Sequence, residues 1–253
     1  MKSVLERLTI IPVSHVSKDS VIAVRKAFNE IKPDIIAVEL CSKRFQALME
    51  IGNRKAGKLE REGKRKKPLF NFYSIKRVGV KGFLFGIIAS FIQKKIGKSL
   101  DIEPGSEMIE AVNIALKNNK QLALVDQDIE ITLKKISINL TLREKFNFLI
   151  DLIKGLFGIG AIKFDINKVP DDELINKILE QTKNRYPSLH KVLVEERNGF
   201  IARKIFNLLI KNENSKVMAV LGAGHKKEII QIIGELEKKL LKNQIEFSYS
   251  FSI

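Results

Sequence analysis

The stretch "LTIIPVSHVSKDSVIAVRKAFNEIKPDIIAVEL", residues 8–40, decides the fold class of this chain. Its two ends, residues 8–13 and 35–40, are continuous apolar runs, which are typical of parallel strands covered on both faces. Between them apolar residues recur at helical spacing, and Pro33 ends the predicted helix because proline cannot continue it. A strand, a crossover helix and a second strand together predict a parallel sheet.

Two further apolar runs complete the predicted sheet, "LALVD" at residues 122–126 and "VMAVLG" at residues 217–222. The first follows a predicted helix that begins at Ser106, and the second leads into the turn "GAGH". Residues 245–251 alternate apolar and polar side chains, which predicts a half-exposed edge strand. The expected fold class is therefore α/β, a mostly parallel central sheet flanked by helices.

The domain organisation follows from where the strand signals lie. Residues 52–104 and 128–215 carry helical patterns and no strand pattern, so we interpret them as helical insertions. We expect one α/β domain over residues 1–253, because a chain of this length has room for one sizeable core and carries no internal repeat.

The cysteine content and the hydropathy of the chain indicate its cellular compartment. Cys41 is the only cysteine, so an internal disulfide is excluded, which fits a reducing compartment. The most apolar windows, residues 82–92 and 146–162, fall short of the roughly 20 apolar residues that a spanning helix needs. We expect a cytoplasmic protein whose apolar windows are buried or lie against a membrane surface.

The chain is basic, with 45 Lys and Arg against 29 Asp and Glu and a formal net charge of +16. Residues 53–67 alone hold eight basic and two acidic side chains. Such a stretch attracts polyanions, so we consider peripheral contact with an anionic membrane beside the simpler interpretation, a solvated connection. Because the stretch has no aromatic residue to stack on bases, no specific nucleic-acid partner is expected.

Ionisable side chains follow all four predicted strands. In order along the chain they are His15, Glu39, Asp126 and His225. In open α/β sheets, ligands bind beyond the carboxyl ends of the strands. A core does not require four such residues at one edge, so we predict a functional site there.

Each of these residues also has a structural interpretation. Glu39 interrupts an apolar run, and a buried carboxylate is costly unless it is paired or binds a metal. Arg44, in the first turn of the next helix, is one candidate partner, and Asp126 is a candidate cap for the helix after it. Gly222 and Gly224 permit a tight turn whose backbone N–H groups are candidates for binding an anion or cofactor.

Five motifs, taken together, resemble the TraB family. They are "HVSKDSVIAVRKAFNEIKPDIIAVELCSKRFQAL", "PGSEMIEAVNIAL", "LVDQDIEITLKK", "VLVEERNGFIARKI" and "AVLGAGHKKEII". The family includes PrgY and archaeal homologues and belongs to a wider group with GumN and the TIKI proteins. The resemblance implies an α/β fold related to erythromycin esterase and ChaN, with two G-x-x-H motifs. TIKI members are described as divalent-metal-dependent proteases, and TraB and PrgY are linked to shutdown of peptide pheromone signals.

The resemblance also implies site positions in this chain. The second G-x-x-H motif is residues 222–225, whereas Pro12 stands in place of the glycine of the first. Gln127 and Asn198 replace the arginine of the usual "DRD" and the aspartate of the usual "ERD". The acidic and basic positions of the family correspond to Glu39, Arg44, Glu107, Asp126, Glu196 and Arg197.

These positions lead to a metallohydrolase hypothesis. His15, Glu39 and His225 are the expected ligands of a divalent metal, Mn, Co or Zn, which would activate water. The general base would be Glu107 or Glu196. Arg44 or Arg197 would hold a substrate carboxylate or the developing oxyanion, and Asp126 is the fifth expected catalytic residue. The expected reaction is amide or ester hydrolysis of a peptide, which would inactivate a peptide signal.

Two other hypotheses stay open. A non-catalytic regulatory protein would bind a peptide or an anion in the same pocket, and Pro12 favours this alternative. A membrane-peripheral or nucleic-acid-binding module would act through residues 53–67 instead. The sequence leaves the oligomeric state open, with a homo-oligomer among the candidates.

Overall fold

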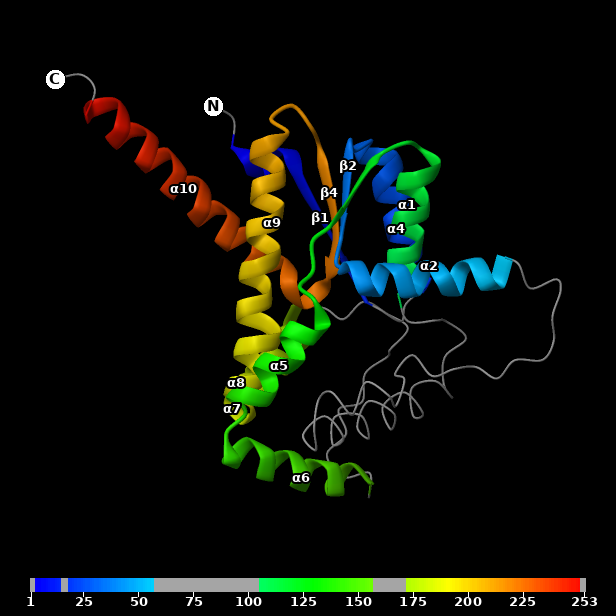
Figure 1. The fold of residues 1–253 in the computed structure, drawn as a ribbon, viewed down its shortest axis with the longest axis vertical. Helices are drawn as coiled ribbons and strands as arrows, with labels where there is room; N and C mark the ends of the chain where they lie inside the picture. Colours follow the sequence, from blue (N-terminus) through cyan, green and yellow to red (C-terminus); the bar gives the residue numbers. More distant parts are fainter. Residues whose placement is uncertain (1–2, 15–17, 57–104, 157–171, 251–253) are drawn as a thin grey trace.

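The computed structural model describes residues 3–14, 18–56, 105–156 and 172–250 (Figure 1). Several predicted features lie outside these residues and keep the status of predictions. They are His15, residues 57–67 of the basic stretch, the apolar window at residues 82–92 and the end of the other window, residues 157–162.

The core of the fold is a parallel sheet of four strands with the order β1-β4-β2-β3. The strands are β1 (Leu8–Val13), β2 (Ile35–Val38), β3 (Gln121–Leu124) and β4 (Val217–Gly222). All four predicted runs form strands, and the α/β fold class is confirmed. The last strand in sequence, β4, lies between β1 and β2, so both central strands are fully buried.

Helices cover both faces of the sheet (Figure 1). On one face lie α9 (Arg197–Lys211) and α10 (Lys226–Ser250), and on the other lie α1 (Lys18–Ile31) and α4 (Ser106–Lys117). The side chains of the central strands alternate between these layers. Val217, Ala219 and Leu221 belong to the α9 and α10 cluster, and Met218 and Val220 belong to the α1 and α4 cluster. Continuous apolar runs arise because both faces of each central strand are covered.

The other α-helices of the described residues lie mostly in the two regions predicted to be helical. They are α2 (Ser42–Ala56), α5 (Ile129–Asn139), α6 (Leu142–Leu156), α7 (Asp172–Arg185) and α8 (Pro187–His190), with the short η1 (Val4–Arg7) before β1. The described part of residues 128–215 is helical, but its last helix, α9, packs on the sheet and contributes to the core. Among the helices of the described ranges, none combines the length and the apolar character needed to cross a bilayer.

Local backbone geometry explains two sequence features. The helix α1 ends at Ile31, where Lys32 adopts a positive φ of 48° immediately before Pro33. Pro12, which replaces a family glycine, lies in β1 opposite Leu221. Since β1 is an edge strand, a residue without an N–H group is tolerated there.

The predicted C-terminal edge strand is wrong. Residues 245–250 belong to α10, and residue 251 lies outside the described ranges. Extending an existing helix adds a hydrogen bond for each residue without a new nucleation cost, whereas a strand needs a partner edge. The alternation of side chains alone therefore did not decide this segment.

Two adjacent isoleucines of α10 test the packing of this layer. Ile229 is 0% exposed in the core, whereas Ile230 is 37% exposed. We expect Ile229→Ala to lower the free energy of unfolding by about 2–5 kcal/mol because it leaves a cavity. Ile230→Ala should change it by about 0.5 kcal/mol, as measured by urea unfolding. Equal losses in the two variants would contradict the placement of α10.

Candidate functional site

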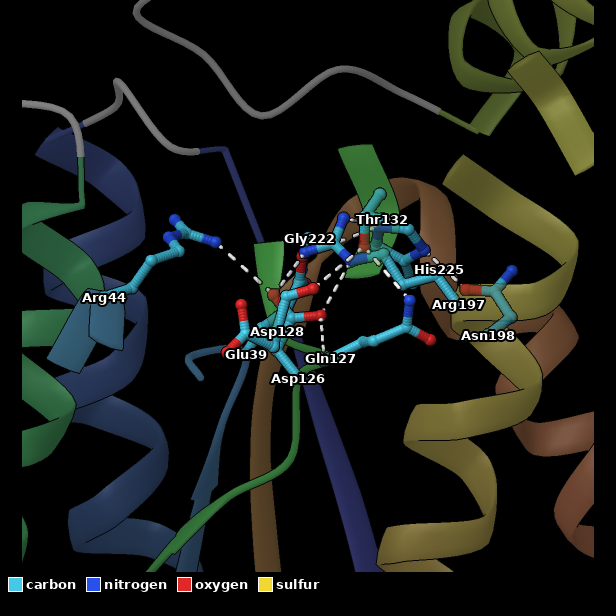
Figure 2. Close-up of polar contacts among 10 residues, drawn as sticks. All are labelled: Glu39, Arg44, Asp126, Gln127, Asp128, Thr132, Arg197, Asn198, Gly222 and His225. Carbon is cyan, nitrogen blue, oxygen red and sulfur yellow. Dashed lines mark hydrogen bonds and ion pairs between the residues drawn. The ribbon is translucent and has the colours of Figure 1, made fainter. Parts of the chain in front are cut away.

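The carboxyl ends of the strands carry a network of charged side chains (Figure 2). Glu39 directly follows β2, and Asp126 lies two residues after β3. His225 ends the short helix η4 (Ala223–His225) that follows β4, and Arg197 is the first residue of α9. The edge predicted from the sequence therefore brings Glu39, Asp126, Arg197 and His225 together.

Arg197 is the centre of this network. Its Nε and Nη2 atoms donate to the two Asp126 carboxylate oxygens, each at 2.8 Å, and Nη2 also donates to Glu39 Oε1 at 2.5 Å. Burial opposes the charged form of Arg197, but the hydrogen bond to Asp126 and the charges of Glu39 and Asp126 outweigh it. The pKa of Arg197 is therefore raised above its ordinary value. Planar bidentate pairing of this kind is the strong form of a charged hydrogen bond.

Glu39 is fully buried, and both of its carboxylate oxygens accept hydrogen bonds. Oε1 faces Arg197, and Oε2 accepts from the backbone N–H of Gly222 at 2.6 Å. The glycine turn was predicted to bind an anion, and the anion at Gly222 is the chain's own Glu39. Gly224, the other glycine named for this role, lies within η4.

Arg44 is not the ion-pair partner of Glu39 considered above, and Asp126 is not the cap of the following helix. Glu39 is paired with Arg197, whereas Arg44 approaches Asp126, with 3.4 Å between Nη1 and Oδ2. Asp126 Oδ1 also accepts from the backbone N–H of Gln127 at 2.8 Å. The cap of α5 is Asp128, whose side chain accepts from the N–H of Glu130, so the expected capping role of Asp126 is wrong.

His225 uses both ring nitrogens within the network. Nδ1 lies 2.5 Å from Asn198 Oδ1, and Nε2 lies 3.4 Å from Arg197 Nη1 and 3.6 Å from Glu39 Oε1. Because a guanidinium group can only donate hydrogen bonds, Nε2 accepts from Arg197. The imidazole therefore presents an acceptor at the sheet edge, with 14% of its side chain exposed.

The fit of a divalent metal can be judged at these atoms. A separation of 3.6 Å between His225 Nε2 and Glu39 Oε1 suits two ligands of one ion with bonds of about 2.0–2.2 Å. Arg197, however, donates to both atoms. Within the described residues, no group of three or more His, Cys, Asp or Glu side chains is arranged to hold a metal. This donor set serves a guanidinium cation instead, and a metal that also uses His15 stays a prediction.

The two glutamates proposed as bases occupy different surroundings. Glu107 is fully buried in the first turn of α4. Glu196 pairs with Lys135 of α5, with 2.6 Å between Oε2 and Nζ, so it joins two helices. His225, in contrast, has a ring nitrogen beside Arg197.

Two features of the site were missed by sequence reasoning. The helical stretch before Arg197 contains a π-helical segment, η3 (Lys191–Glu196), and such segments are frequent at functional sites. No residue pattern signals it. The contact of Asn198 with His225 was also missed, although the departure of Asn198 from the family pattern was its signal.

A small cleft opens beside the network, with a volume of about 140 Å³. Arg44, Asp126 and Arg197 provide its charged wall, while Ile129 and Leu193 provide apolar surface. Arg44 has 38% of its side chain exposed, so its guanidinium is accessible from this cleft. The cleft therefore suits a small anionic group attached to an apolar one.

Substitution of Arg197, the central cation of the network, should destabilise the fold. We expect Arg197→Met to lower the free energy of unfolding by about 3–5 kcal/mol, because two buried carboxylates lose their partner. Arg203→Met, at an exposed position of the same helix, should cost about 0.5 kcal/mol. In urea unfolding, the double variant Arg197→Met and Glu39→Gln should be more stable than Arg197→Met alone. If the double variant instead lost the sum of the unfolding free energies lost by Arg197→Met and by Glu39→Gln, the two side chains would not interact and the charge network would be refuted.

Comparisons with known proteins agree with the motifs. The profile of the TraB/PrgY/gumN family matches residues 6–242. The uncharacterised protein MJ1365 of Methanocaldococcus jannaschii is 36% identical over 237 residues, 90% of this chain and 53% of that protein. TraB domain-containing proteins of Bos taurus and Homo sapiens are 26% and 25% identical over 198 and 201 residues, 77% of this chain and 50% of each relative. The chain thus spans about half the length of these curated relatives, and it belongs to the TraB/PrgY/gumN family.

Proposed function

We propose that this chain is a hydrolase that cleaves an amide or ester bond of a peptide, with His225 as the acid–base group. The observation that carries the proposal is the acceptor Nε2 of His225, presented beside Arg197 and Glu39 at the carboxyl edge of the sheet. Inactivation of a peptide signal is the role that the family resemblance implies for such an activity.

The proposed reaction uses the chain's own residues. A water molecule replaces the long contact of Arg197 Nη1 with His225 Nε2 and gives its proton to Nε2, while the water oxygen forms a bond to the carbonyl carbon. The carbon–nitrogen or carbon–oxygen bond then breaks, and the imidazolium returns its proton to the leaving group. Glu39, 3.6 Å from Nε2, stabilises the imidazolium, and the Arg44 guanidinium stabilises negative charge on the substrate.

A second candidate, non-catalytic binding of a peptide or an anion in the same pocket, is favoured by Arg44. Its contact with Asp126 is long at 3.4 Å, and it lines the cleft with an accessible guanidinium. Asp126, the carboxylate that Arg44 contacts, is already engaged by Arg197. A carboxylate on a ligand would therefore find a cation whose donors are weakly engaged.

Loss of His225 tests the catalytic proposal. We expect His225→Gln to lower the hydrolysis rate by about 10²- to 10⁴-fold on random-sequence short peptides, because the proton acceptor is removed. The control is Lys226→Gln, at the exposed neighbouring position, which should leave the rate unchanged. Product formation is followed by mass spectrometry. Peptide binding without turnover in the wild type would support the second candidate.

Substitution of Arg44 tests anion recognition in both candidates. We expect Arg44→Gln to raise the Kd for carboxylate-terminated peptides about 10- to 100-fold, since a charged hydrogen bond is lost. Arg25→Gln is the control, because Arg25 pairs with Glu110 at the surface. Calorimetry with the same peptides as C-terminal amides should show little difference between wild type and Arg44→Gln. An equal loss for the amides would argue against carboxylate recognition.

A further inference from the structure

We infer that Glu228, acting through Asn198, holds His225 in the tautomer with the proton on Nδ1. The inference rests on the proposed role of His225 as a base and makes Asn198 and Glu228 positioning residues. The three side chains come from η4, α9 and α10. We refer to His225, Asn198 and Glu228 as the relay.

The contacts of the relay are short. Asn198 is fully buried, and its Nδ2 donates to Glu228 Oε2 at 2.7 Å. At the other end of the amide, Oδ1 lies 2.5 Å from His225 Nδ1. A single buried amide therefore connects a partly buried carboxylate to an imidazole, over the contact between α9 and α10.

Donor and acceptor chemistry determines the direction of every bond. A carboxylate only accepts hydrogen bonds, so the amide NH₂ of Asn198 must face Glu228. The amide oxygen then faces His225, and since it too only accepts, Nδ1 must carry the proton. Glu228 thereby decides the orientation of Asn198, and Asn198 decides the tautomer of His225.

A longer contact on the other side of the ring favours the same tautomer. Arg197 Nη1 lies 3.4 Å from Nε2, and a guanidinium can only donate. Nε2 therefore carries the unprotonated lone pair that a general base requires, and a water molecule would use it in place of the long Arg197 contact. Two constraints from opposite sides of the imidazole agree on one protonation state.

The position of Glu228 supports its part in the relay. It lies in the first turn of α10, where the helix dipole favours a negative charge. The family resemblance expects an aspartate at the position of Asn198, which would bring a carboxylate directly to His225. In this chain the carboxylate is one amide further away, on Glu228.

The test is the tautomer of His225, measured by nitrogen-15 NMR of the imidazoles in the full chain. The chain has three histidines, and the His225→Gln spectrum identifies the signals of His225. In the wild type we expect a protonated Nδ1 and an unprotonated Nε2. A wild-type ring with its proton mainly on Nε2 would overturn the inference directly.

Variants of Glu228 separate positioning from stability, because Glu228 is partly exposed and Asn198 is buried. We expect Glu228→Leu to free the amide and to raise the fraction of His225 in the Nε2–H form, because the 3.4 Å contact with Arg197 is weaker than the 2.5 Å contact with Asn198. Glu228→Gln should retain the wild-type tautomer, since its amide oxygen still accepts from Asn198. Glu235→Leu, at an exposed position of the same helix, is the matched control and should change nothing. An unchanged tautomer in Glu228→Leu would refute the relay.

The readout is independent of the proposed activity. If the tautomer responds as expected but no peptide is cleaved, the relay stands and the proposed hydrolysis fails. If peptides are cleaved, the cleavage rate should fall in Glu228→Leu, recover in Glu228→Gln and stay at the wild-type level in Glu235→Leu. Catalysis that depends on His225 with no response of the tautomer to Glu228 would overturn the relay and leave the proposed function intact.

Discussion

The ion pairs of Arg197 with Glu39 and Asp126 are the interaction on which the rest of the site depends. Glu39 and Asp126 end neighbouring strands and are both buried, so neither carboxylate can face the interior without a cation. Arg197 supplies that cation from the first turn of α9, and its planar fork meets Asp126 through two bonds while reaching Glu39. The pairs thereby join one helical layer to the ends of β2 and β3.

This pairing also limits the chemistry of the site. With both carboxylates engaged by Arg197, and Glu39 also bound to the Gly222 N–H, the acidic side chains act mainly to hold the network in place. His225 is different, because one ring nitrogen is held by Asn198 and the other faces the site. The network therefore divides into carboxylates that support the site and a histidine that faces it.

Much of the fold was predictable because its signals are local. The four apolar runs, the end of α1 before Pro33 and the start of α4 at Ser106 follow from residues close together in sequence, and they agree with the structure. The edge of the sheet that carries the charged side chains was predictable as well, since Glu39 directly follows β2 and Asp126 lies two residues after β3. The prediction failed where two local signals competed, as at residues 245–250, where alternation suggested a strand but the chain continues α10. It was also wrong about the cap of α5, since Asp126 and Asp128 are equally good capping residues in sequence.

The sequence by itself determined the strands, the family and the edge of the sheet that carries the charged residues, because each rests on residues that are neighbours along the chain. Only the tertiary structure decided which charges meet. Arg197 lies 158 positions from Glu39, and it replaces the nearby Arg44 as partner because α9 brings its guanidinium to the strand ends. The orientation of Asn198 between Glu228 and His225 was equally out of reach of the sequence. A hydrogen-bond direction depends on which groups face each other across packed helices, and residue order does not specify that.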